Sequence, residues 1–139
     1  MNQRAASVLA RVLVADDEPG ILRAMHASLT RAGFDVTTVD DGAPAIALAD
    51  SAAFAIVVVD LHMATGGLAV VRHFKQRYGA GVYCAVLSGE DDDDTRALCV
   101  EAGADDVFAK PVPAAVLRRR LTEVALALRS AAAPGERSA

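Results

Sequence analysis

The chain has 139 residues and a mass of 14.4 kDa, which allows one ordinary domain and leaves little room for a second. Apolar residues make up 53% of it and charged residues 23%, so it can form a packed core and is not intrinsically disordered. The net charge of −4 argues against a protein that contacts nucleic acid through its overall charge. Its longest uninterrupted apolar run, residues 52–59, is far shorter than the ~20 residues of a membrane helix. We therefore expect a soluble cytoplasmic protein with no direct contact to nucleic acid or membrane.

Three short runs, residues 12–15, 56–59 and 82–87, are apolar at every position. Such runs indicate strands that are covered on both faces, as in a parallel sheet between two layers of helices. Residues 34–39 are more mixed and suit a strand nearer the edge of the sheet. Residues 106–109 are a fifth short candidate.

Helical segments are expected between and after these strands. Pro19 begins the first of them and Gly33 ends it, while Gly103 ends the fourth. Five strand–helix units in succession predict an α/β domain with a doubly wound parallel sheet. We assign residues 8–130 to this domain, residues 1–7 to an N-terminal tail and residues 131–139 to a flexible C-terminal tail. The predicted helices span residues 19–32, 43–53, 68–78, 92–102 and 113–129, the last burying Val116, Leu117, Leu121, Val124 and Leu128.

Polar residues follow the predicted strands at their carboxyl ends, where doubly wound folds bind ligands. Three carboxylates brought to one edge of a sheet repel one another and need a counter-charge. A hard divalent cation such as Mg²⁺ is one candidate and a lysine is another. Together with a hydroxyl group, such a set suits a bound phosphoryl group. The residues are Asp16 and Asp17 after the first strand, Asp60 after the third, Ser88 after the fourth and Lys110 after the fifth.

The motifs that carry these residues resemble the signature of two-component response-regulator receiver domains. They read Val-Ala-Asp16-Asp17-Glu-Pro, Val-Val-Asp60-Leu-His-Met, Leu-Ser88-Gly and Phe-Ala-Lys110-Pro, in the order found in the family. The resemblance covers about residues 10–129. It implies a flavodoxin-like sheet of five parallel strands in the order 2-1-3-4-5.

The resemblance also implies a function in a phosphorelay. Asp60 would accept a phosphoryl group from a phosphohistidine on a sensor histidine kinase or a phosphotransfer protein. Asp17 and Asp60 would ligate Mg²⁺ together with the backbone carbonyl of His62, and Asp16 would act largely through water.

Further roles follow from the same resemblance. Ser88 and Lys110 would bind oxygens of the phosphoryl group, and a cis peptide bond before Pro111 would aim Lys110 inward. His62 and Glu90 match two positions that tune dephosphorylation, and Gly89 leaves room for the phosphoryl group.

The sequence departs from the family pattern at two places. Residues 63–67 lack the usual proline and form a stretch one residue shorter than usual before the next helix. Val107 stands where receivers carry Tyr or Phe, so the usual aromatic switch is absent and phosphorylation must be reported by other movements, or only weakly. Phe108, one residue later, should face the core on the opposite side of the sheet.

The sequence is compatible with three functions. The leading one is a phosphorylation-dependent signalling module that is not itself an enzyme. It would contact an effector, or a second copy of itself, through its fourth helix, fifth strand and fifth helix. The second is a constitutive interaction module, which Val107 favours. The third is a small aspartate-nucleophile phosphatase, which is weaker because His62 stands where those enzymes carry an acid.

The remaining polar and cysteine residues have simpler interpretations. The acidic run 91–94 is interpreted as a helix cap, and the arginine run 118–120 as a solvated helix face. Asp40 and Asp41 follow the second strand and should lie away from the carboxylate cluster. His26 and His73 are expected at the surface, and Cys84 and Cys99 as reduced core residues.

Overall fold

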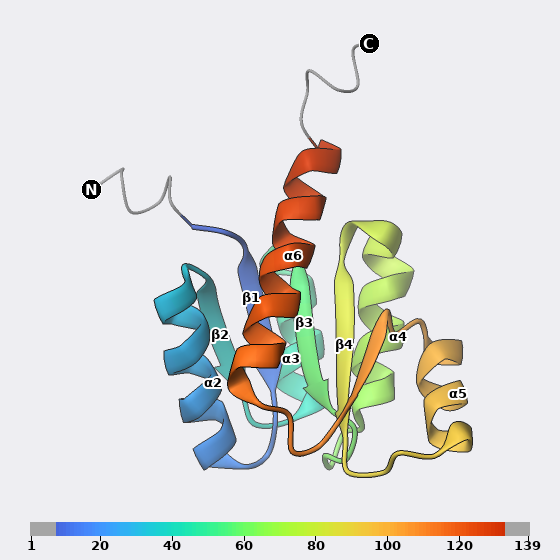
Figure 1. The fold of residues 1–139 in the computed structure, drawn as a ribbon. Coiled ribbons are helices and arrows are strands. Elements are labelled where there is room, and N and C mark those ends of the chain that lie inside the picture. The colour runs from blue at the N-terminus through green and yellow to red at the C-terminus, as the bar shows by residue number, and fades with distance from the viewer. Residues whose placement is uncertain (1–7, 133–139) are drawn as a thin grey trace.

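The computed structural model describes residues 8–132. One parallel sheet has the strand order β2-β1-β3-β4-β5, which confirms the predicted flavodoxin-like fold. Helices α2 and α6 cover one face of the sheet, and α3, α4 and α5 cover the other (Figure 1). The elements are β1 (Arg11–Ala15), α2 (Pro19–Ala32), β2 (Asp35–Val39), α3 (Gly42–Ala49), β3 (Ile56–Asp60), α4 (Gly67–Tyr78), η1 (Gly79–Gly81), β4 (Tyr83–Ser88), α5 (Asp93–Ala102), β5 (Asp106–Ala109) and α6 (Ala114–Ala132).

The inner strands feed two hydrophobic cores, one on each face of the sheet. Along β3, Val57 and Val59 pack with α3, α4 and α5, whereas Ile56 and Val58 pack with α2 and α6. This alternation follows from the two-residue repeat of a strand and explains why the run is apolar at every position. Phe74 of α4 is among the largest fully buried side chains. The edge strands β2 and β5 are only partly buried, as their mixed sequences predict.

Four details differ from the sequence prediction. Helix α3 ends at Ala49 rather than at residue 53, because the next residues turn back onto the Leu48 carbonyl. Helix α6 continues to Ala132, two residues past the predicted domain boundary, and the rest of both predicted tails lies outside the described residues. Val116 is 52% exposed rather than buried, since it lies one residue from the buried stripe that begins at Leu117. His73 is half-buried rather than at the surface.

Both cysteines are buried and free, as predicted for reduced core residues. Burial raises the pKa of the Cys84 thiol to about 12 and raises the pKa of Cys99 as well. Neither thiol is therefore a thiolate at neutral pH. Within residues 8–132, every helix is too short or too polar to cross a bilayer.

Candidate functional site

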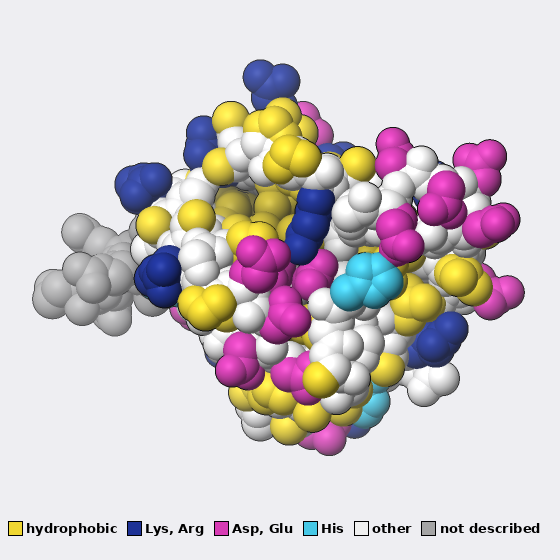
Figure 2. All heavy atoms as spheres, turned by 90° about the horizontal axis from the view of Figure 1, so that it is seen from below, with side chains coloured by type: hydrophobic (Ala, Val, Ile, Leu, Met, Phe, Trp, Pro, Cys, Tyr) yellow, Lys and Arg dark blue, Asp and Glu magenta, His cyan; other side chains and the backbone are white. Residues whose placement is uncertain are grey.

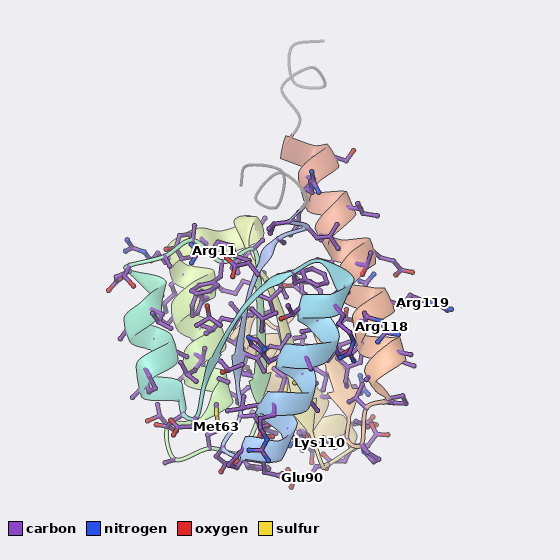
Figure 3. All side chains as sticks on the ribbon, turned by 90° about the vertical axis from the view of Figure 1, so that its left-hand side faces the viewer. Arg11, Met63, Glu90, Lys110, Arg118 and Arg119 are labelled. Atoms are coloured by element: carbon purple, nitrogen blue, oxygen red, sulfur yellow. The ribbon has the colours of Figure 1, made fainter. Side chains whose placement is uncertain are left out.

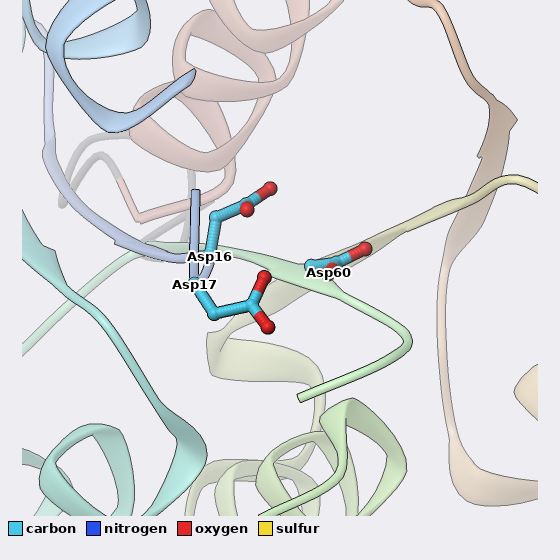
Figure 4. A group of neighbouring side chains, drawn as sticks. All are labelled: Asp16, Asp17 and Asp60. Carbon is cyan, nitrogen blue, oxygen red and sulfur yellow. The ribbon is translucent and has the colours of Figure 1, made fainter. Parts of the chain in front are cut away.

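Three carboxylates meet where the carboxyl ends of β1 and β3 lie side by side. Asp16 and Asp17 directly follow β1, and Asp60 is the last residue of β3. Each residue offers one carboxylate oxygen to a group in which all the oxygens lie within 4.8 Å of one another (Figure 4). Asp16 and Asp60 are 1% and 5% exposed, and Asp17 is exposed. The structure thus brings together the three aspartates that the sequence predicted.

Lys110 supplies the counter-charge on the same edge of the sheet. Its Nζ lies 2.8 Å from Asp60 Oδ1 and 3.6 Å from Asp16 Oδ2. Burial opposes the charged ammonium, but the hydrogen bond to Asp60 and the charges of both aspartates outweigh it and raise the pKa of Lys110. Figure 2 looks onto this face, where acidic side chains lie beside a basic one, and Figure 3 shows Lys110 and Glu90 at the same end of the molecule. The peptide bond that follows, Lys110–Pro111, is cis, as the resemblance implied.

The carboxylate group is suited to a hard metal ion. Asp16 Oδ1 accepts a hydrogen bond of 2.9 Å from the Glu18 backbone N–H, whereas the buried Asp16 Oδ2 accepts no hydrogen bond and has the Lys110 ammonium only at 3.6 Å. A buried carboxylate oxygen in that state has a strong tendency to find a proton or a cation. Because the donors are all oxygens, the set matches Mg²⁺ rather than a metal that prefers nitrogen or sulfur.

The buried carboxyl group of Asp16 makes the stability of the folded protein depend on pH. Burial raises its pKa above the ordinary 3.8, partly opposed by the Glu18 N–H, and the charge of Asp60 adds to the rise. The folded state then binds this proton more tightly than the unfolded state, so stability is lost as the pH rises from 3.8 through the raised pKa. We expect Asp16→Asn to raise the Tm in EDTA at neutral pH by a few degrees.

Thermal unfolding followed by circular dichroism between acidic and neutral pH checks this expectation. The advantage of Asp16→Asn should shrink as the pH falls below 3.8. Asp50→Asn, at an exposed residue that pairs with Arg77, is the matched control. A lower Tm for Asp16→Asn at neutral pH would contradict the account.

Ser88 and the loop after β4 make local contacts in this state. The Ser88 hydroxyl donates to the Glu90 carbonyl at 2.9 Å and accepts from the Glu90 N–H at 3.0 Å. Ser88 is fully buried and lies at the predicted edge of the sheet. Its hydroxyl forms hydrogen bonds with Glu90 instead of with Asp60 or Lys110. The Lys110 N–H donates to the Ser88 carbonyl at 2.8 Å, which ties the two strand ends together.

His62 and Glu90 join the loops after β3 and β4. His62 Nε2 lies 2.6 Å from Glu90 Oε1, and both side chains are exposed. A Cβ placed on the neighbouring Gly89 would meet no atom of the described protein within 4 Å, so packing does not demand glycine there. Two of the residues predicted to modulate the site, His62 and Glu90, are thus in contact with each other across these loops.

Val107 and Phe108 point to opposite faces of β5, as predicted. Val107 packs against the core under α5, and Phe108 packs against the core under α6. An apolar cavity of about 460 Å³ opens on the α6 side, between α2 and α6, and Lys110 forms part of its wall. It corresponds to the hollow with yellow walls in Figure 2.

The loop after β3 is held very close to the strand that it leaves. A Cβ added to Gly67 would lie 2.4 Å from the backbone oxygen of Asp60, whereas one added to Gly66 would meet nothing within 4 Å. We expect Gly67→Ala to shift the backbone of Asp60 and to lower the free energy of unfolding by about 1–3 kcal/mol. Urea unfolding measures this change, and Gly66→Ser, which keeps a good N-cap residue, should be close to wild type. Equal stability of the two variants would refute the close contact.

The sequence analysis missed one residue near the site. Asp41 lies outside the carboxylate cluster, as predicted, but its side chain reaches the loop after β3 and accepts a hydrogen bond from the Thr65 N–H at 2.8 Å. The Asp-Gly pair at residues 41–42 was a visible signal of a helix start, but it does not reveal a bond to a residue 24 positions away.

Comparison with known proteins agrees with this geometry. The family model described as "Response regulator receiver domain" matches residues 12–122. Over 112 residues the chain is 36% identical to the transcriptional regulatory protein PrrA of Mycobacterium tuberculosis, covering 80% of this chain and 48% of that protein. It is 34% identical over 111 residues to a cyclic di-GMP phosphodiesterase of Thermotoga maritima, covering 80% of this chain and 30% of that protein. The chain thus spans half or less of the length of these relatives.

A solved structure shows the same fold. The BeF3-activated receiver domain of DrrB superposes with a TM-score of 0.75 at 28% sequence identity, covering 83% of this chain and 96% of that one. Since the family model spans most of the described residues, and the sheet order and strand-end residues agree with it, the chain belongs to the response regulator receiver domain family.

Proposed function

We propose that Asp60 accepts a phosphoryl group from a phosphohistidine, with Mg²⁺ held by the carboxylates of Asp17 and Asp60. Asp16 would hold the ion largely through water, and the backbone carbonyl of His62 would complete the ligand set. The observation that carries this proposal is the arrangement around Asp60, whose carboxylate lies 2.8 Å from Lys110 and within 4.8 Å of the other two aspartates.

In the proposed reaction an oxygen of Asp60 forms a bond to phosphorus while the phosphorus–nitrogen bond of the donor breaks, and the imidazole leaves carrying a proton. Bound Mg²⁺ would neutralise charge on the phosphoryl oxygens. Lys110 would hold another of these oxygens with its ammonium group, because it already faces Asp60. Ser88 would have to give up its bonds to Glu90 before it could donate to the phosphoryl group.

The consequence of phosphorylation would be a movement of the loop after β4. A phosphoryl group adds about two negative charges, which favour the turning of Ser88 toward Asp60 and would release the backbone of Glu90. That movement would alter α5, β5 and the start of α6, the surface proposed for an effector or a second copy of the chain. Val107 leaves no aromatic ring to move with Ser88, so the change would be transmitted by the loop itself.

His62 and Glu90 would tune how long the phosphoryl group survives. Their contact spans the two loops over the site, so it would restrict the approach of water to a phosphoryl group on Asp60. Gly89 would leave room for that group, since its surroundings are open.

The partners of the whole protein belong to the same proposal. A sensor histidine kinase or a phosphotransfer protein would be the donor, in the cytoplasm. PrrA is named as a transcriptional regulator and the Thermotoga maritima relative as a phosphodiesterase, and both are longer than this chain. We therefore propose that this domain signals without being an enzyme itself. A constitutive interaction module is the second candidate, favoured by Val107.

Phosphorylation by a small donor tests the proposal. Wild-type protein with Mg²⁺ and acetyl phosphate should gain the mass of one phosphoryl group, and beryllofluoride should shift the amide NMR signals of the loops after β3 and β4. EDTA should abolish both effects. Unchanged mass and unchanged spectra in Mg²⁺ would overturn the proposal and favour the constitutive module, and steady turnover of a generic phosphomonoester would instead support a phosphatase.

A further inference from the structure

Among the residues that the structure describes, the side chain of Asp41 forms the only hydrogen bond that ties the start of α3 to the loop after β3. Its Oδ1 accepts from the Thr65 N–H at 2.8 Å, while its Oδ2 accepts from the Ala43 N–H at 3.4 Å and caps α3. The two oxygens of one carboxylate thus serve two different segments. The hydrogen bond from Thr65 is the main reason that the pKa of Asp41 is lowered, so this carboxylate is charged at neutral pH.

The backbones of the same two segments are in direct contact. A Cβ added to Gly42 would lie 2.4 Å from the Thr65 backbone oxygen, so a side chain at this position would push the loop away. Asp41 therefore bonds the backbone N–H of Thr65, and Gly42 lies against the carbonyl of the same residue. This residue of the loop is held on both sides of its backbone.

The loop held in this way is the one that carries the site. It begins at Asp60, passes through His62 and ends at α4, where Gly67 closes back on Asp60 through its contact with the Asp60 carbonyl. The Gly67 N–H also donates to the Leu61 carbonyl at 3.2 Å. One end of the loop is therefore fixed by β3 and the other by Gly67. Thr65 lies between His62 and Gly67, and its position is fixed by the hydrogen bond to Asp41.

We propose that Asp41 is a positioning residue that fixes the loop carrying the His62 carbonyl and thereby sets the affinity of the site for Mg²⁺. This inference rests on the proposed function. The loop is one residue shorter than is usual in the family and lacks the usual proline, so an external hydrogen bond supplies rigidity that its own sequence does not. Groups that orient metal ligands in this manner change metal affinity by about 10- to 100-fold when removed.

The alternative is that Asp41 only caps α3, and three variants separate the two roles. Asp41→Ala removes both bonds. Asp41→Ser keeps a favourable N-cap residue but is one bond shorter and is expected not to reach Thr65. Asp41→Asn keeps one acceptor oxygen, which can take the bond from Thr65 or the bond from Ala43 but not both, since its amide nitrogen only donates. Asp92→Ala is the matched control, because Asp92 caps α5 by accepting from the Thr95 N–H at 2.7 Å, a bond that stays at the start of its own helix.

The experiment is a Mg²⁺ titration of each folded variant followed by amide NMR shifts, together with hydrogen exchange of the Thr65 amide. Asp41→Ala and Asp41→Ser should need about tenfold more Mg²⁺ for half-saturation and should lose protection at Thr65. Asp92→Ala should stay within about twofold of wild type, and Asp41→Asn, which keeps one of the two acceptors, should lie between wild type and Asp41→Ala. The maximal rate of modification by acetyl phosphate at saturating Mg²⁺ should fall far less than the affinity, because the bound ion restores the loop.

The outcomes are decisive either way. If Asp41→Ala does not fold, Asp41→Ser, which retains the cap, carries the test. Wild-type Mg²⁺ affinity in Asp41→Ser, or an equal loss in Asp92→Ala, would overturn the positioning role and leave the proposed function intact. Wild-type protein that binds no Mg²⁺ would overturn both.

Discussion

Asp60→Asn is expected to reduce phosphoryl uptake from acetyl phosphate at least about 10³-fold, because an amide cannot act as the nucleophile. The side chain keeps its size and one oxygen acceptor for Lys110, so the fold should be retained. Intact-mass spectrometry in Mg²⁺ measures the uptake, and circular dichroism checks the fold.

A matched substitution shows whether the effect belongs to the site. Asp35 is an exposed residue of β2 that pairs with Arg11, and Asp35→Asn should be modified at the wild-type rate. Uptake by Asp60→Asn at more than a few per cent of the wild-type rate would show that another group accepts the phosphoryl.

Lys110→Met is expected to have two effects of opposite sign. Removing the ammonium takes away the positive charge that competes with a cation, so Mg²⁺ should bind severalfold more tightly. The same change removes a charged donor to the phosphoryl oxygens, so phosphoryl uptake at saturating Mg²⁺ should fall about 10²-fold. A Mg²⁺ titration and a time course of intact mass measure the two effects separately.

The other lysine of the chain, Lys75, is the control. Lys75 lies 2.7 Å from Asp105 and donates to the Val82 carbonyl at 2.6 Å, near the amino ends of β4 and β5. Lys75→Met should lower stability while leaving Mg²⁺ affinity and phosphoryl uptake at saturation unchanged. Weaker Mg²⁺ binding by Lys110→Met, or equal loss of uptake in both variants, would contradict the role given to Lys110.

The sheet could be predicted because each inner strand is apolar on both faces. The runs at residues 12–15, 56–59 and 82–87 all became buried strands in the predicted order. The meeting of Asp16, Asp17 and Asp60 followed from this order, since parallel neighbours end at the same edge. The strand-end residues therefore needed no knowledge of side-chain geometry to be placed near one another.

Contacts between loops and between helix faces were harder to predict from the sequence. The bond from Thr65 to Asp41 depends on how far a loop folds back, and the bonds of Ser88 to Glu90 depend on the local turn. Val116 and the early end of α3 show the same difficulty, because apolar composition alone does not fix a helix face or its last residue.

The identity of the modified residue is the most direct check on the mechanism. Borohydride reduces an acyl phosphate of aspartate to homoserine, so protein treated with acetyl phosphate and then with borohydride can be digested and mapped by mass spectrometry. We expect homoserine at position 60 and at no other aspartate. Homoserine at position 16 or 17, or a stable phosphate elsewhere with position 60 unmodified, would contradict the assignment of Asp60 as the phosphoacceptor.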